Sequence, residues 1–175
     1  MPHIFLLAGP PAVGKSTTAR ALAAHFEKSL HIPVDDLREM VVSGLALPGP
    51  TWDAPLVEQL ALARQCAARM ALTYRRAGFT VALDDFWDPN SRLLEYAPLL
   101  EEPDVHRIML YPSQRAAEER NRKRDGSAYI ADGIRLVYAG LGAGLARLER
   151  EGWLIVDTTE KTAEETVKHI LSRVE

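Results

Sequence analysis

GPPAVGKST, residues 9–17, is the stretch that decides the expected fold of this 175-residue chain. Gly9 and Gly14, with a Lys-Ser pair after them, have the spacing of a phosphate-binding loop, whose backbone N–H groups turn inward around an anion. The apolar run His3–Ala8 comes before it as a strand, and Lys15–Lys28 follows with a helical pattern. The N-terminus of that helix adds the equivalent of roughly half a positive charge. The sequence therefore predicts a nucleotide phosphate site between a strand and a helix.

Each polar side chain of the loop has an expected role toward ATP and Mg²⁺, the cofactors that the motif indicates. Lys15 should reach the β- and γ-phosphates, Ser16 should ligate Mg²⁺, and Thr17 is a candidate for the α-phosphate. The backbone cradle should come from Gly9, Ala12, Val13 and Gly14. The alternative is a Gly-rich turn with an incidental Lys-Ser pair, which the flanking strand and helix disfavour.

Short apolar runs alternate with helical patterns along the whole chain. The expected strands are His3–Ala8, Leu30–Val34, Thr80–Leu83, Val105–Tyr111 and Trp153–Val156. The expected helices are Lys15–Lys28, Asp36–Ser43, Ala54–Ala77, Pro89–Leu99, Ser113–Lys123, Ala128–Glu151 and Ala163–Val174. Strands that are apolar throughout suit a parallel sheet covered on both faces, so we expect a single α/β domain over residues 1–175. One helix should carry a core-facing stripe through Leu56, Leu60, Ala63, Ala67, Met70 and Tyr74.

The composition disfavours several classes of protein. Hydrophobic residues make up 47% and charged residues 26% of the chain, and no apolar stretch is long enough to span a bilayer. The first residues do not resemble a signal peptide, and a single cysteine cannot form an internal disulfide, so we expect a cytoplasmic protein with Cys66 buried in a helix. A net charge of −3 disfavours general affinity for nucleic acid, although one nucleic-acid end could still bind. Nothing in the sequence sets the oligomeric state.

Charged residues follow the second predicted strand, at the edge of the sheet where open α/β folds bind ligands. Asp35 and Arg38 share one side of the start of the next helix. Asp35 is a candidate base that orients an acceptor hydroxyl, and Arg38 is a candidate to hold an anionic group beside it. A surface ion pair is the alternative. Asp36 stands three residues before Glu39, which is the spacing of a helix cap.

The third strand ends in Asp84-Asp85-Phe86-Trp87. A carboxylate in this place commonly supports Mg²⁺ through water or holds the acceptor. Adjacent side chains point in different directions, so we assign Asp84 to the metal side and Asp85 to the acceptor or to a contact with Arg38. Phe86 and Trp87 are candidates for a wall of the acceptor site, with simple packing as the alternative.

A basic segment follows the fourth strand. Five basic and three acidic residues lie within Ser113–Asp125, and Arg120 and Arg124 share a helical face. One reading is a solvated helix. The other, which we favour, is a lid over residues of about 113–145 that closes on ATP and supplies an arginine to the transferring phosphoryl group. After the fifth strand, Thr158 stands where a turn could contact the adenine.

The motifs GPPAVGKST, VDDLR and VALDDFWDP, with the Arg-rich segment after them, resemble those of the small P-loop kinases. This AAA-type, zeta toxin-like group of P-loop NTPases includes chloramphenicol phosphotransferase and the kinase domain of 5′-polynucleotide kinases. The resemblance implies a three-layer αβα fold whose five-stranded parallel sheet has the order 2-3-1-4-5, with a helical lid.

The resemblance also implies roles for particular residues. Asp35 would be the general base, Arg38 would contact the acceptor side, and Arg120 or Arg124 would contact the ATP phosphates. Asp85 resembles the acid after the third strand in polynucleotide kinases. The chain lacks the extensions of zeta toxins and has no phosphatase domain, and its segment Gly44–Pro55 matches no acceptor loop of the group. The resemblance therefore transfers no substrate.

These observations favour transfer of the γ-phosphate of ATP, with Mg²⁺, to a hydroxyl of a small acceptor. The acceptor could be a nucleoside or nucleotide sugar, an antibiotic or a nucleic-acid 5′ end, and the negative net charge favours a small molecule over a polymer. Two other classes stay open. One is a nucleotide-dependent ATPase or switch, for which the sequence has no guanine-reading Asn-Lys-x-Asp. The other is a non-catalytic nucleotide-binding fold, which the intact Lys15 and Ser16 disfavour.

Overall fold

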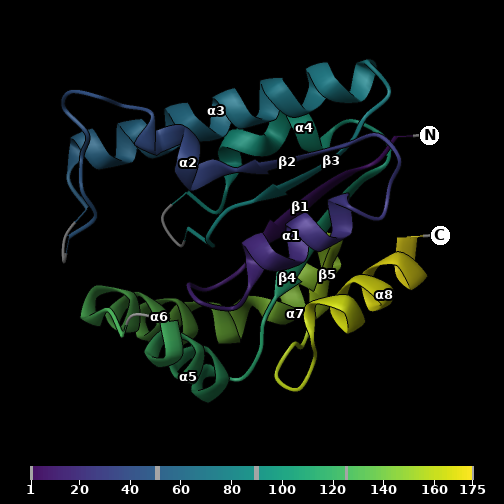
Figure 1. Ribbon diagram of the computed structural model, residues 1–175. Helices are drawn as coiled ribbons and strands as arrows, with labels where there is room; N and C mark the ends of the chain where they lie inside the picture. Colours follow the sequence, from purple (N-terminus) through teal and green to yellow (C-terminus); the bar gives the residue numbers. More distant parts are fainter. Residues whose placement is uncertain (1, 50–51, 89–90, 125, 175) are drawn as a thin grey trace.

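The protein, a computed structural model, is built on one five-stranded parallel sheet (Figure 1). The structure describes residues 2–49, 52–88, 91–124 and 126–174. The strands are β1 Ile4–Ala8, β2 Ser29–Pro33, β3 Thr80–Asp84, β4 Val105–Leu110 and β5 Trp153–Val156. Their order is β2-β3-β1-β4-β5, which confirms the predicted order 2-3-1-4-5. Every residue of β1 and β3 is buried, as expected for apolar strands covered on both faces.

The register of the strands brings their carboxyl ends to one edge of the sheet. Leu7 of β1 lies beside Asp84 of β3 and beside Ile108 of β4, and Pro33 of β2 also lies beside Asp84. The phosphate-binding loop after β1, the residues after β2 and the acids of β3 therefore emerge side by side. This is the edge at which open parallel sheets bind their ligands.

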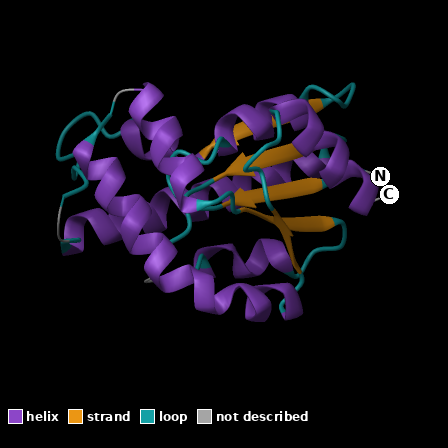
Figure 2. Cartoon of the chain, turned by 90° about the horizontal axis from the view of Figure 1, so that it is seen from below, coloured by secondary structure: helices purple, strands orange, loops and turns teal. Residues whose placement is uncertain are grey.

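Helices cover both faces of this sheet, as Figures 1 and 2 show from two sides. On one face, α1 Lys15–Ala23 and α8 Ala163–Val174 pack against apolar side chains that include Phe5 and Leu7. On the other face, Ile4 and Leu6 pack against α3 Ala54–Arg76, η1 Leu94–Tyr96, α4 Ala97–Leu100 and α7 Leu145–Arg150. Within the described ranges, no helix is both long and apolar enough to cross a membrane.

Three more helices lie in the segments that follow β2 and β4. They are α2 Val34–Glu39, α5 Gln114–Arg124 and α6 Ala128–Leu141. α6 contributes to both cores, because Ile134 packs with the α1 and α8 side while Val137 and Leu141 pack with the α3 side. It also approaches the phosphate-binding loop, since a Cβ at Gly133 would lie 3.5 Å from Pro11 Cγ.

Four of the expected helices have bounds that differ by two residues or more in the structure, one of them the expected helix Asp36–Ser43, which is α2 Val34–Glu39. α1 ends at Ala23 instead of Lys28. The expected helix Ala128–Glu151 is divided into α6, the 3₁₀ turn η2 Gly142–Gly144 and α7, and the glycines at 140, 142 and 144 weaken an α-helix at this place. Residues 89–90, the start of the expected helix Pro89–Leu99, lie outside the described residues. The remainder forms a turn, then η1 and α4.

Two smaller expectations are wrong. Asp36 does not cap a helix, because α2 already begins at Val34 with Pro33 at the cap position, and Asp36 lies in the first turn. At that position the negative charge of Asp36 interacts favourably with the helix dipole. Cys66 is exposed rather than buried. The buried side of α3 runs through Leu56, Leu60, Ala63, Ala67 and other residues at helical spacing, and Cys66 lies off that side.

Candidate active site

The loop between β1 and α1 has the backbone conformation that phosphate binding needs. Gly14 has a φ of 93°, in the left-handed region that residues with a side chain rarely adopt. A side chain at Gly9 would bring its Cβ within 2.4 Å of the Leu110 carbonyl oxygen. Ala12 also has a positive φ, of 61°. Such changes in the sign of φ let successive N–H groups converge on one anion, and the first turn of α1 adds its dipole.

Lys15 lies among the acidic residues at this edge of the sheet. Its Nζ donates a hydrogen bond to the Pro10 carbonyl at 2.8 Å. Burial lowers the pKa of Lys15, and the charges of Asp35, Asp84 and Asp85 oppose that shift. These carboxylates come from two segments far apart in the sequence, and the fold brings them together around one ammonium group.

Ser16 and Asp84 form a pair of oxygen ligands beside the loop. Ser16 Oγ donates a hydrogen bond to Asp84 Oδ1 at 3.0 Å, and the other carboxylate oxygen lies 3.2 Å from His31 Nε2. A hydroxyl and a carboxylate are the kind of donors that Mg²⁺ prefers, with water and phosphate completing its shell. The residues therefore fit the implied metal. His31 of β2 was not identified from the sequence, because it lies within an apolar run.

Asp35 and Arg38 lie in the same short helix but have different surroundings. Asp35 is exposed in the first turn of α2. Arg38 is only 7% exposed, and its Nη1 donates to the Ala46 carbonyl at 2.8 Å. Gln59 of α3 holds the same segment, since it accepts from the Ala46 N–H at 2.9 Å and donates to the Gly44 carbonyl at 2.7 Å. Arg38 thus fixes the segment after α2. Among the described residues, it forms no hydrogen bond or ion pair with Asp35.

Asp85 is buried in an ion pair instead of facing an acceptor or Arg38. Its Oδ2 accepts hydrogen bonds from Arg64 Nε at 2.7 Å and from the Tyr96 hydroxyl at 3.0 Å. Both charged side chains of this pair are 1% exposed. Burial raises the pKa of Asp85, and the neighbouring Arg64 opposes the shift. The expected placement of Asp85 is therefore wrong, because its carboxylate is paired with Arg64, which comes from α3.

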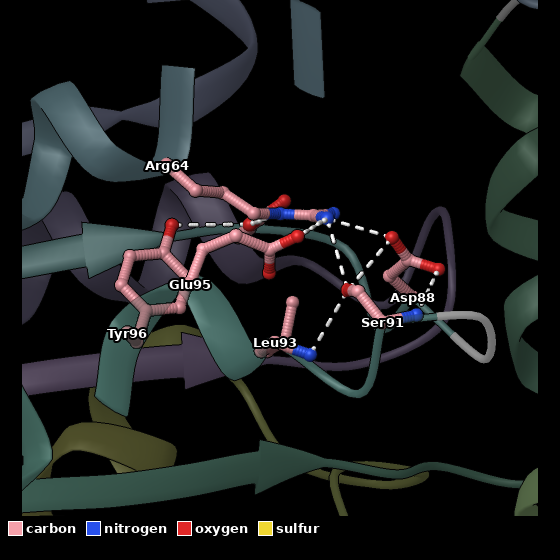
Figure 3. Close-up of polar contacts among 7 residues, drawn as sticks. Arg64, Asp88, Ser91, Leu93, Glu95 and Tyr96 are labelled. Carbon is pink, nitrogen blue, oxygen red and sulfur yellow. Dashed lines mark hydrogen bonds and ion pairs between the residues drawn. The ribbon is translucent and has the colours of Figure 1, made fainter. Parts of the chain in front are cut away.

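Arg64 connects this pair to a wider network, which Figure 3 shows. Arg64 Nη1 donates to Asp88 Oδ2 at 2.6 Å and to Ser91 Oγ at 3.2 Å. It also lies 3.8 Å from Glu95 Oε1. Arg64 Nη2 and Glu95 Oε2 are buried with no hydrogen-bond partner in the described part of the chain. One arginine thus holds the residues after β3 to α3.

Phe86 and Trp87, the two aromatic residues after Asp85, have different surroundings. Trp87 is 6% exposed and packs edge-on against Trp153, with ring centroids 5.8 Å apart. It belongs to the core, so its expected place in an acceptor wall is wrong. Phe86 is half-buried, its ring lies 5.6 Å from that of Trp52 at 82°, and the guanidinium carbon of Arg64 lies 5.1 Å from its centroid. Phe86 is the one of the two that remains near the surface.

A second group of residues surrounds a cavity of about 180 Å³ on the far side of the phosphate-binding loop. The cavity is lined by Val13, Gly14, Thr17, Thr18, Arg120, Thr158, Lys161, Ala163 and Thr166. Arg120 of α5 donates to the Thr158 carbonyl at 2.6 Å and to the Val13 carbonyl at 3.2 Å. Thr158 is 3% exposed, and its hydroxyl lies 3.3 Å from Arg120 Nη1. The expected nucleotide residues Thr17 and Thr158 therefore meet at one cavity.

The other basic residues of this segment, Arg115, Arg122, Lys123 and Arg124, are exposed. Arg124 stands in the last turn of α5 with its side chain exposed. The end of the expected basic segment, Asp125, lies outside the described residues. Arg120 and Arg124 thus differ in their surroundings, because Arg120 already bridges two loops while Arg124 is exposed.

Tyr129, in the first turn of α6, is a further residue that the sequence reasoning missed. Burial raises the pKa of Tyr129, the charge of Asp35 also raises it, and Arg38 and the Trp52 side chain lower it. The charges of Asp35 and Arg38 thus act on the Tyr129 hydroxyl. The available signal was an aromatic residue at the start of the expected helix Ala128–Glu151.

Comparisons with known proteins agree with this geometry. A family model described as an AAA domain matches residues 4–151. The tunicamycin resistance protein of Deinococcus radiodurans is 20% identical over 99% of this chain and 96% of its own, with a TM-score of 0.65. A gluconokinase from Sinorhizobium meliloti 1021 is 19% identical over 99% of this chain and 91% of its own, with a TM-score of 0.64. A sugar kinase from Janibacter sp. HTCC2649 is 16% identical over 98% of this chain and 94% of its own, with a TM-score of 0.65.

At these identities the solved structures share the fold of this chain, and they confirm the expected resemblance to P-loop kinases. Among curated proteins, none matches the sequence.

Proposed function

Because this chain belongs to the AAA domain family and has a P-loop kinase-like fold, we propose that it transfers the γ-phosphoryl group of ATP to a hydroxyl of a small molecule. The observation that supports this most is the register of the sheet, which brings the end of β2, followed by Asp35, beside Asp84, the residue hydrogen-bonded to Ser16 of the phosphate-binding loop. Lys15 would bind the β- and γ-phosphates. Asp35 is exposed beside it, where an acceptor hydroxyl could approach.

In the proposed reaction, the acceptor oxygen forms a bond to the γ-phosphorus while the bond from that phosphorus to the β–γ bridging oxygen breaks. ADP leaves with the bridging oxygen, and the proton of the acceptor hydroxyl passes to the Asp35 carboxylate. Lys15 balances the negative charge of the transferring group. Mg²⁺, held by Ser16 and through water by Asp84, would supply further neutralisation of the β- and γ-phosphate oxygens.

The basic segment has two proposed roles. Arg120 and Thr158 would hold the base side of the nucleotide, because they line the cavity beyond the phosphate-binding loop. Arg124 would reach the phosphates when the segment of residues 113–145 closes as a lid. His31 would position Asp84 through the contact at 3.2 Å.

Phosphate transfer from γ-labelled ATP to a panel of alcohols tests the proposal, with release of phosphate to water measured in parallel. Asp35→Asn should lower kcat for transfer by about 100-fold or more, since a positioned base contributes at least that much. The KM for ATP should stay unchanged. Asp36→Asn is the matched control, because Asp36 is exposed in the same helical turn.

Two results together would make the kinase proposal wrong. They are phosphate release only to water with every acceptor, and the same rate of release for Asp35→Asn as for the unaltered protein.

A further inference from the structure

Three aromatic side chains come from segments at the edge of the sheet that carries Asp35, where Pro33 pairs with Asp84, two residues before Asp35 and Phe86 respectively. Trp52 lies in the segment before α3, Phe86 follows the acids of β3, and Tyr129 belongs to the first turn of α6. Trp52 and Phe86 are half-buried, and Tyr129 is 39% exposed. Figure 1 shows the segment between α2 and α3 descending on the side of α6. We refer to these three residues as the aromatic cluster.

Phe86 is held firmly in this cluster. The guanidinium carbon of Arg64 lies 5.1 Å from the centroid of its ring, within the range of a cation–π contact. Arg64 itself is fixed by hydrogen bonds of 2.7 Å to Asp85 and 2.6 Å to Asp88 (Figure 3). The position of the Phe86 ring therefore depends on a buried ion network rather than on a mobile surface contact.

Trp52 is held at both ends of its segment. On the C-terminal side, the Asp53 side chain accepts a hydrogen bond from the Leu56 N–H at 2.9 Å and caps α3. On the N-terminal side, Arg38 donates to the Ala46 carbonyl at 2.8 Å. The Trp52 ring stands edge-on to Phe86, with centroids 5.6 Å apart. A planar group could stack on such a ring in the space beside Asp35.

The cations of this region are already engaged. Lys15 donates to the Pro10 carbonyl and belongs to the phosphate site, and Arg38 donates to the Ala46 carbonyl. Arg64 is shared between Asp85 and Asp88. Asp35 and Asp84 add negative charge nearby. Four carboxylates, those of Asp35, Asp84, Asp85 and Asp88, thus outnumber the three cations, and an anionic acceptor would enter a region of net negative charge.

From the aromatic cluster and the engaged cations, we infer that the acceptor is an uncharged alcohol that carries a planar ring. The ring stacks on Trp52 and meets Phe86 edge to face, because the planes of these two side chains are 82° apart. Tyr129 covers the ring from α6, and the hydroxyl lies at Asp35. This inference rests on the proposed kinase function and narrows its substrate class. It excludes sugar acids and ringless polyols as preferred acceptors.

Matched acceptors separate the contributions of ring and charge. Uridine and phenylethanol carry a ring without charge, ribose and glycerol lack an aromatic ring, and gluconate is an anion. We expect phosphate transfer to uridine or phenylethanol with a kcat/KM at least about 10-fold above that for the other three, as loss of one stacking contact commonly costs this much. Ribose, glycerol or gluconate serving as well as the ring-bearing alcohols would overturn the inference and leave the kinase function standing.

Variants of the aromatic cluster provide the second measurement. Trp52→Ala should lower kcat/KM for the ring-bearing acceptor by about 10-fold, while Trp52→Phe retains most of it. The KM for ATP and the melting temperature should not change, because Trp52 is half-exposed and lies outside the phosphate site. Phe86→Leu should act like Trp52→Ala, since leucine keeps apolar volume but has no ring face. Unchanged kcat/KM in both Trp52→Ala and Phe86→Leu would overturn the inference.

Quenching of tryptophan fluorescence tests ring binding independently of phosphate transfer. Of the three tryptophans in the chain, Trp87 and Trp153 are 6% and 7% exposed, so a bound ring should quench chiefly Trp52. If the protein phosphorylates no acceptor, the proposed function fails. Quenching by uridine or phenylethanol that disappears in Trp52→Phe would then still support a ring-binding site, and no quenching by either compound would overturn it.

Discussion

Replacing Arg64 by methionine tests the buried network that supports the candidate site. Methionine preserves much of the apolar volume but removes the charge and the donors, which leaves Asp85 and Asp88 buried without their cation. The donor distances are 2.7 and 2.6 Å, and the three side chains are between 1% and 4% exposed. Breaking a buried pair of this kind costs about 3–5 kcal/mol of the free energy of unfolding. In a chain of this length that loss corresponds to a fall in melting temperature of roughly 6–20 °C.

The loss of unfolding free energy in Arg64→Met should depend on pH in a defined direction. Burial already raises the pKa of Asp85, with Arg64 opposing the shift, so removal of Arg64 should raise that pKa further. A carboxyl whose pKa is raised in the folded state binds more protons there than in the unfolded chain. Its contribution to stability is therefore lost as the pH rises from about 3.8 through the folded pKa. The deficit of Arg64→Met should be largest at neutral pH and smaller in acid.

Urea unfolding followed by circular dichroism measures both effects. Arg69→Met is the matched control, because Arg69 lies on the same helix with its side chain exposed, and its change should stay within about 0.5 kcal/mol. Adding Asp85→Asn to Arg64→Met should restore part of the stability, since it removes one uncompensated charge. The reasoning fails if Arg64→Met is as stable as Arg69→Met, or if its deficit does not shrink in acid.

Three further substitutions test other parts of the structure. Arg120→Ala should raise the Kd for ATP by about 10-fold with little change in kcat, because Arg120 lines the cavity in which we propose that the base side of the nucleotide binds; calorimetry showing unchanged affinity would contradict this. Asp84→Asn should raise the Mg²⁺ concentration that half-saturates turnover, and an unaltered Mg²⁺ titration would remove Asp84 from the metal side. Burial and His3 lower the pKa of His106, so the unfolded chain binds more protons and stability should fall as the pH drops below about 6.5. His106→Gln should flatten that part of the curve of melting temperature against pH, and an equally steep curve would show that His106 is not responsible.

The features that could be predicted from the sequence are those set by local pattern. The phosphate-binding loop needs glycine at defined positions, and Gly9 and Gly14 have the close approach and positive φ that explain them. The five strands are mostly apolar, and β1 and β3 are buried throughout because both faces of the sheet are covered, so their existence and approximate bounds could be predicted. Their spatial order came from the family resemblance, since apolar character alone does not order strands.

The misplaced residues depend on partners that lie far away in the sequence. Asp85 was expected at the acceptor, but its partner Arg64 is on another element. One signal was present, because Arg64 stands four residues after Leu60 on the buried side of α3. A charged residue within an apolar stripe needs a buried counter-charge, and the acids after β3 were available. Trp87 and Phe86 alternate in direction, but the pattern did not indicate which of them faces the core.

The double packing of α6 restricts how the predicted lid could move. Ile134 is embedded in one core, and Val137 and Leu141 are embedded in the other, so the C-terminal part of the helix is anchored on both sides of the sheet. Gly133 lies close to Pro11 of the phosphate-binding loop, and α6 can pivot at this position. The first turn of α6, which lies before Gly133 and carries Tyr129, is the part of the helix that would move. A small displacement of the phosphate-binding loop on nucleotide binding would therefore produce a larger movement of Tyr129 over the acceptor site. This movement would couple the binding of the two substrates.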